Sequence, residues 1–227
     1  MTTIIVADDH PLFRGALKQT LLDAKAEFAR DLNILEAKDI DATYQLLTQH
    51  SDTDLLLLDL HIPGAQGFSG LVNLRGCFPF VPIAMFSGSD AGYIIERAAN
   101  LGASGFIPKS TAPDLIVSAI QTLLSGEHWY PSYPSRSDQP TLNLQISDIA
   151  EKVASLTPHQ FRVYTMINEG LLNKQIAYEL DISETTVKSH VKMILKKMGV
   201  RKRTEVIILA NTLQVENPDD LLSRESD

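Results

Sequence analysis

Residues 4–14 read IIVADDHPLFR, an apolar run that stops at the adjacent carboxylates Asp8 and Asp9. The run predicts a buried strand, because Ile and Val are enriched in strands. Pro11 and the apolar residues that follow at three-to-four spacing predict a helix directly after it. Two like charges at the end of a buried strand repel each other and lose hydration, so the pair requires a compensating group.

The first half of the chain alternates strand-like and helix-like segments. Its apolar runs lie at Thr3–Asp8, Asn33–Ala37, Asp54–Asp59, Pro82–Ser87 and Ser104–Pro108. Strands that alternate with helices favour a parallel sheet covered by helices on both faces. We therefore predict an α/β domain with a doubly wound parallel sheet of these five strands, in which LLLLD, residues 55–59, is a central strand.

A segment dense in Pro and Ser separates the two halves of the chain. Residues 126–143 read GEHWYPSYPSRSDQPTLN, a composition typical of a linker. Beyond it the strand signals end and short helical patterns follow. The predicted boundaries are a first domain at 1–126, a linker at 127–152, a small all-α domain at 153–215 and a tail at 216–227.

Composition and charge narrow the class of protein. The 227 residues include one cysteine, Cys77, so no intrachain disulfide can form, and a reducing cytoplasmic location is expected. We expect no signal peptide, because MTTIIVADDH lacks a basic n-region and its apolar run is short. We also expect no membrane span, because no apolar run reaches roughly 18 residues. Residues 1–150 carry a balance of −8, whereas residues 151–227 are neutral and place seven bases and no acid between Thr186 and Arg203. This basic patch suggests nucleic acid as a partner.

Several polar residues fall at or just after the ends of predicted strands. They are Asp8, Asp9, Asp59, Ser87 and Lys109. Since ligands of such sheets bind beyond the carboxyl ends of the strands, these side chains are expected to meet. A few carboxylates suit Mg²⁺, and a carboxylate beside the ion can attack a phosphoryl group while a lysine and a hydroxyl share the charge on the transferred oxygens.

Each of these residues also has an ordinary interpretation. An Asp pair after a strand is more often a turn or a helix cap, a single serine a loop hydroxyl and a single lysine a solvated surface residue. Their coincidence at four strand ends favours the phosphoryl site.

The same residues resemble the receiver domain of two-component response regulators of the NarL/FixJ type, which has a flavodoxin-like fold. The motifs are DDHPLFR, LLLLDLHIPGAQG, MFSGSD and GASGFIPKS. The resemblance implies that Asp59 accepts the phosphoryl group and that Ser87 and Lys109 assist. It implies that Mg²⁺ is held by Asp8, Asp9, Asp59 and the backbone carbonyl of His61, and that Phe106 swings inward when Ser87 moves. The longer stretch KAEFARDLN, residues 25–33, departs from the family and has no assigned role.

Helix signals dominate the second half of the chain. Thr157 with Gln160 predicts a capping box, Asn173 and Ser183 are expected to cap the next two helices, and Gly170 fits a helix end. The last of these helices carries an apolar stripe and a row of lysines at Lys188, Lys192 and Lys196. A solvated face is the usual reason for such a row. Here it lacks nearby acidic partners, which favours a helix-turn-helix whose second helix enters the major groove.

From LTPHQF to VIILA this half resembles a LuxR-type DNA-binding domain of four helices, most specifically in EGLLNKQIAYEL and ISETTVKSHVKMILKKMGV. The resemblance implies base contacts from Lys188, Ser189 and Lys192. It implies backbone contacts from Asn173, Lys174, Thr186, His190 and Lys196. The apolar segment Val206–Ala210 would pair two copies. His159 and Gln160 stand where the family usually has Arg and Glu, which would loosen an internal ion pair and keep the cap.

The predicted function is that of a transcription factor, not an enzyme, which receives a phosphoryl group on Asp59 from a sensor histidine kinase. Its partners would be promoter DNA, a second copy when active, and RNA polymerase as a further candidate. One alternative is a regulator controlled by a ligand or by protein contact without phosphate. Another is an aspartyl-phosphate phosphohydrolase of the haloacid dehalogenase type, although that family has Asp-x-Asp on its first strand.

The sequence leaves open how phosphate would control DNA binding. The acidic first domain could cover the basic helix until phosphate releases it, or phosphate could drive dimerisation. Masking predicts that a fragment from about Ser147 onward binds DNA more tightly than the unphosphorylated whole chain.

Overall fold

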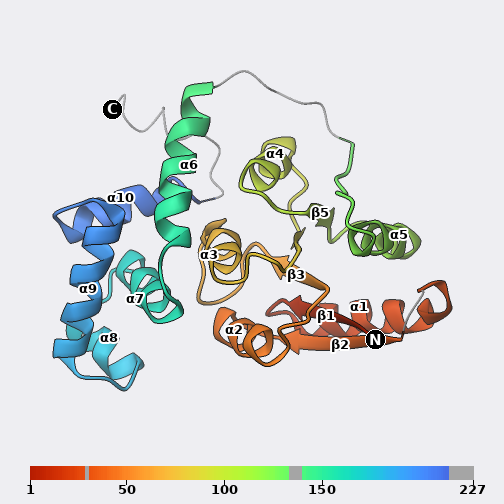
Figure 1. Cartoon of the computed structure of the whole chain (residues 1–227), viewed down its shortest axis with the longest axis horizontal. Helices are drawn as coiled ribbons and strands as arrows, with labels where there is room; N and C mark the ends of the chain where they lie inside the picture. The colour runs from red at the N-terminus through yellow and green to blue at the C-terminus, as the bar shows by residue number, and fades with distance from the viewer. Residues whose placement is uncertain (29–30, 133–139, 215–227) are drawn as a thin grey trace.

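A computed structural model of the chain describes residues 1–28, 31–132 and 140–214 (Figure 1). The predicted tail at 216–227 lies outside the described residues. None of the helices among the described residues has the length and apolar character that crossing a bilayer requires.

A parallel sheet forms the centre of the first domain. Its strands are β1 (Thr2–Ala7), β2 (Leu32–Ala37), β3 (Leu55–Asp59), β4 (Ile83–Ser87) and β5 (Gly105–Pro108). They pair in the order β2-β1-β3-β4-β5 and all run parallel. The doubly wound sheet expected from the sequence is therefore confirmed, with the all-buried β3 at its centre. The strand order changes direction at β1 and β3, and ligands of such sheets bind there.

Helices cover both faces of the sheet. They are α1 (Pro11–Asp23), η1 (Lys25–Glu27), α2 (Ile40–Gln49), α3 (Ser69–Cys77), α4 (Gly92–Asn100) and α5 (Pro113–Leu124). Alternate residues of the strands point to opposite faces. Ile4 and Leu57 therefore pack in a core with α1 and α5, whereas Ile5 and Leu58 pack in a core with α2, α3 and α4.

The segment predicted as a linker is partly ordered along the sheet and partly helical. Residues 128–130 run beside β5, where the Phe106 N–H donates to the Trp129 carbonyl at 2.9 Å and Gly105 pairs with Trp129. Helix α6 then spans Pro140–Ala154. The Pro- and Ser-rich composition made this segment read as a linker. A helix can nevertheless begin at Pro140, because the first turn of a helix does not need the N–H that proline lacks.

The second domain contains four further helices: α7 (Pro158–Asn168), α8 (Asn173–Glu179), α9 (Glu184–Met198) and α10 (Arg203–Asn211). Thr157 and Gln160 form the expected capping box, and Ser183 caps α9 by accepting from the Thr186 N–H at 3.0 Å. The cap expected at Asn173 is wrong by one residue. Asn173 is the first residue of α8, and the preceding Leu172 N–H donates to the Gln175 side chain at 2.7 Å.

Helix α6 packs against α3 of the first domain and joins the two cores (Figure 1). Asn73, which has no exposed surface, donates to the carbonyls of Val153 at 2.8 Å and Leu156 at 3.0 Å. Further contacts join Arg162 to Asp41 at 3.0 Å. The second domain is therefore docked on the first in this structure, rather than joined to it by the linker alone.

Gly76 makes the closest approach in this interface, and Gly76→Ala is predicted to loosen it. A Cβ at Gly76 would lie 2.2 Å from the Ala154 carbonyl oxygen, and overpacking of this kind costs about 1–3 kcal/mol. The variant should unfold at a lower temperature and exchange the amides of α6 faster, measured by calorimetry and hydrogen exchange.

Gly15→Ala is the matched control, because Gly15 is also within a helix and a Cβ there would meet nothing within 4 Å. Removing a helical glycine there should leave stability unchanged or raise it by about 0.4–1 kcal/mol. Equal behaviour of the two variants would show that the α3–α6 contact is not tight.

Candidate phosphoryl site and DNA-binding helix

Four of the five polar residues predicted at the strand ends, Asp8, Asp9, Asp59 and Lys109, lie together in the structure. The Lys109 Nζ lies 2.6 Å from an Asp8 oxygen and 3.2 Å from an Asp59 oxygen. Both carboxylates are nearly fully buried, whereas about two fifths of the Asp9 side chain is exposed. Lysine therefore supplies the positive charge between the carboxylates in this structure.

The carboxylate of Asp59 is incompletely satisfied by the protein. Its Oδ1 is buried and accepts no hydrogen bond. Burial raises the pKa of Asp59 and the nearby Asp8 raises it further, whereas the Lys109 ammonium and a hydrogen bond from the His61 backbone lower it. A buried oxygen without a donor has lost its hydration without replacement, so the site is suited to a further cation or to an electrophile at that atom.

The remaining predicted residues of this site are Ser87, Phe106 and His61, which lie on β4, on β5 and just after β3. Ser87 is buried at the end of β4, and its Oγ accepts from the Ser89 N–H at 3.2 Å. Phe106 is fully buried in the core, so its ring is already inward. His61 follows β3 and is exposed.

Two residues of this site, Phe13 and His10, were not identified from the sequence. The centroid of the Phe13 ring lies 5.0 Å from the Lys109 Nζ and 5.1 Å from the centroid of the tilted Phe86 ring. Phe13 therefore holds the lysine from the α1 side. The His10 Nδ1 lies 2.7 Å from Asp9 and 3.1 Å from Asp8. The position of His10 directly after the acidic pair was the available signal for that residue.

The donor set fits a hard divalent cation. Asp8, Asp9, His10 and Asp59 bring ligand atoms within 4.8 Å of one another. Three of these residues are carboxylates, the ligands that Mg²⁺ prefers, and the unpartnered Asp59 oxygen supplies a free acceptor.

Helix α9 presents the predicted basic face. Val187, Ile194 and Met198 are fully buried, while Lys188, Ser189, Lys192 and Lys196 are exposed on the other side. The helix ends at Gly199, which has a left-handed φ of 71°. One expectation is wrong: the lysine row has an acidic partner, because Lys188 pairs with Glu184 at 2.9 Å.

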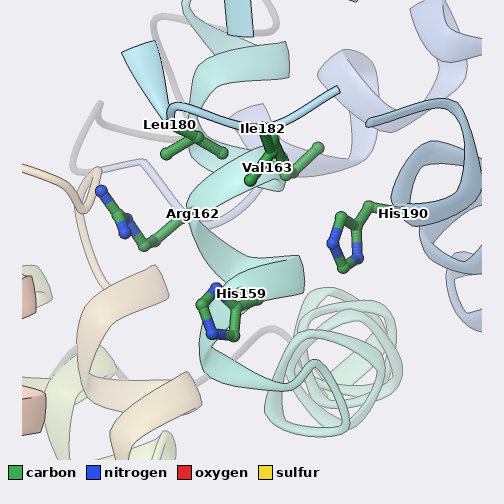
Figure 2. A pocket seen from close by; sticks show the side chains of 6 residues that line it. All are labelled: His159, Arg162, Val163, Leu180, Ile182 and His190. Carbon is green, nitrogen blue, oxygen red and sulfur yellow. The ribbon is translucent and has the colours of Figure 1, made fainter. Parts of the chain in front are cut away.

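The predicted backbone contacts are placed less uniformly. Lys174 and Thr186 are exposed. Asn173 accepts a hydrogen bond from Arg203 at 3.1 Å. Figure 2 shows His190 beside a pocket of about 210 Å³ that His159 and Arg162 also line, so its ring lies on the flank of α9 toward α7.

Gln160 was expected to loosen an internal ion pair, because the family usually has Glu at this position. In the structure its side chain makes internal hydrogen bonds. Its Oε1 accepts from the Lys197 Nζ at 2.7 Å, and the same ammonium donates to the Ser155 carbonyl at 2.6 Å. The neutral Gln160 side chain therefore accepts from Lys197 and also from the Thr157 N–H of the cap.

The first domain does not cover the basic face in this arrangement. Among the described residues, its hydrogen bonds and ion pairs to the second domain go to α6, α7 and the end of α10, as in Thr165 to the Gly64 carbonyl at 3.2 Å and the Phe68 N–H to the Leu213 carbonyl at 2.9 Å. Lys188, Lys192 and Lys196 stay exposed. In this arrangement the first domain therefore does not mask α9 directly. A fragment that begins at Ser147 would also lack the first part of α6.

Two protein-family models match the chain. Residues 4–121 match the response regulator receiver domain, and residues 154–210 match the bacterial regulatory proteins of the luxR family. Together they cover the two domains seen in the structure.

Curated relatives align with nearly the whole chain. The glycerol metabolism activator of Pseudomonas putida is 38% identical over 217 residues, which cover 94% of this chain and 96% of the relative. The nitrate/nitrite response regulator protein NarL of Escherichia coli K12 is 33% identical over 207 residues, with coverage of 91% and 93%.

A solved structure shares the fold. RcsB from Salmonella enterica serovar Typhimurium, bound to promoter rprA in the presence of the phosphomimetic BeF3⁻, aligns with a TM-score of 0.52 and 24% identity. The alignment covers 94% of this chain and 100% of that one.

Proposed function

Since this chain belongs to the NarL/FixJ family of response regulators and is a DNA-binding regulator of transcription, we propose that phosphorylation of Asp59 controls its binding to promoter DNA. The observation that carries this proposal is the buried, unpartnered Asp59 oxygen beside the Lys109 ammonium. The donor would be the phosphohistidine of a sensor kinase, and the site of action the cytoplasm.

The chemistry at Asp59 is a simple displacement. A carboxylate oxygen attacks phosphorus, the bond from phosphorus to the donor breaks, and the donor keeps the electron pair. The Lys109 ammonium and the Ser87 hydroxyl would stabilise the transferred oxygens. Because the Asp59 side chain is buried, the phosphorylated carboxylate would be poorly exposed to water.

Mg²⁺ would be held by Asp8, Asp9, Asp59 and the backbone carbonyl of His61. When bound, it would neutralise the carboxylates and the phosphoryl oxygens. The protein's own part is to keep Asp8 and Asp59 close together through β1 and β3, whose register places Ala7 beside Leu58.

Loss of the metal or of Asp9 should slow phosphorylation. Asp9→Asn, or addition of EDTA to the wild type, is predicted to reduce the rate of uptake from acetyl phosphate by at least about tenfold. Intact-mass spectrometry over time measures it. Asp90→Asn is the control, since Asp90 is exposed beyond β4. Uptake at the wild-type rate in EDTA would contradict the metal site.

The loop after Asp59 gives a physical route to the second domain. The loop runs from β3 to α3, and two of its residues contact that domain: Gly64 through Thr165 and Phe68 through Leu213. A phosphoryl group at the start of the loop can thus bias how the two domains dock.

DNA would bind the exposed face of α9. We propose base contacts from Lys188, Ser189 and Lys192, with Lys174, Thr186 and Lys196 at the phosphates. Asn173 would contact a phosphate only after releasing its hydrogen bond from Arg203. His190 would do so only after its ring leaves the pocket that it lines with His159 and Arg162. Dimerisation would use α10, where Ile208 is 67% exposed. The RcsB structure, which shares this fold, is bound to promoter DNA, which supports promoter DNA as a partner of this chain.

A further inference from the structure

Met193 is an apolar side chain left at the basic face of α9. The other large apolar residues of this helix are buried or half-buried, with Val187, Ile194 and Met198 at 0% exposure, whereas Met193 is 42% exposed. It therefore contributes little to the core of its own domain.

The position of Met193 places it among the residues proposed to contact DNA. It follows Ser189 by four residues and precedes Lys196 by three, and residues at these spacings are neighbours on one side of a helix. It also directly follows Lys192, whose ammonium is free of ion pairs among the described residues. A helix that brings Ser189 to a base therefore brings the Met193 thioether, one turn further along the same side, to the groove as well.

The chemistry of the Met193 thioether limits which groups in the major groove it can contact. Methionine has no hydrogen-bond donor and only a weakly accepting sulfur, so it cannot pair with the edges that lysine reads. Its flexible chain packs well against apolar groups, and the apolar group that the major groove displays is the 5-methyl of thymine.

We propose that Met193 reads a thymine methyl in each half-site and so fixes a T·A pair beside the bases read by Lys192. This inference rests on the proposed function, because it requires α9 to enter the major groove. It adds a specificity residue that the lysine pattern does not reveal.

Deoxyuridine substitution tests the contact directly. A duplex is first selected from a random pool with the acetyl phosphate-treated wild-type protein, and each thymine is then replaced singly by deoxyuridine, which lacks only the methyl. One replacement per half-site should weaken wild-type binding about fourfold, the effect of exposing one buried methyl-sized group. With Met193→Ala the same replacement should have no effect, and Met193→Leu should restore sensitivity.

Lys192→Ala and Leu172→Ala serve as controls. Lys192→Ala should weaken binding but keep the response to deoxyuridine. Leu172→Ala removes an apolar residue outside α9 that is more exposed than Met193, at 67% against 42%. Equal affinity for thymine and deoxyuridine at every position, in a protein that binds the selected duplex, overturns this inference alone. Failure to select any duplex overturns the proposed function and this inference with it.

Discussion

Asp59→Asn should leave the protein unable to take up a phosphoryl group from acetyl phosphate, while the wild type gains one. The amide removes the nucleophilic oxygen and keeps the shape of the side chain, so the core around β3 should persist. The Lys109 ammonium would still pair with Asp8 at the 2.6 Å contact. Intact-mass spectrometry measures uptake, and thermal unfolding checks the fold.

Asp52→Asn is the control for this variant. Asp52 is exposed in the turn before β3, at the opposite edge of the sheet, and its replacement should leave uptake unchanged. An adduct that persists in Asp59→Asn would mean that another residue accepts the phosphoryl group.

Lys192→Ala should produce the largest loss of DNA binding from a single change in α9. Lys192 is exposed and, among the described residues, free of the kind of ion pair that holds Lys188 to Glu184. Loss of a good base contact costs about 1–3 kcal/mol and relaxes the preference for that base. Fluorescence anisotropy with the selected duplex and with single-base variants measures both effects.

Lys174→Ala is the matched comparison at the phosphate backbone. It should weaken binding to all duplexes alike and flatten the dependence of log affinity on log salt by about one unit of slope. Wild-type affinity in both variants would show that α9 is not the recognition helix.

The receiver site could be predicted because its chemistry follows from strand ends. Asp8, Asp59, Ser87 and Lys109 each close an apolar run, and a parallel sheet brings such ends together whatever its side chains are. Phe13 was missed because an aromatic residue within a helix pattern reads as core. Its contact with Lys109 depends on the rotation of α1 over the sheet.

The docking of the two domains could not be predicted from local patterns. Asn73 is an ordinary polar residue in sequence, and only the approach of α6 turns it into a buried donor to Val153 and Leu156. Helix α6 itself was hidden by its Pro- and Ser-rich surroundings. Helical periodicity was enough to predict that the lysines of α9 are exposed. The position of His190, on the flank of α9 toward α7, depends on how α7 packs and could not be predicted.

The affinity of the full-length protein for its selected duplex, measured with and without acetyl phosphate and Mg²⁺ at one salt concentration, tests the central claim most directly. The claim is that phosphate on Asp59 controls DNA binding by α9. Phosphorylation should raise the affinity by about 5- to 150-fold, the usual range of coupling between two sites, and Asp59→Asn should show no change. An affinity that is the same before and after phosphorylation of the wild type would contradict the claim.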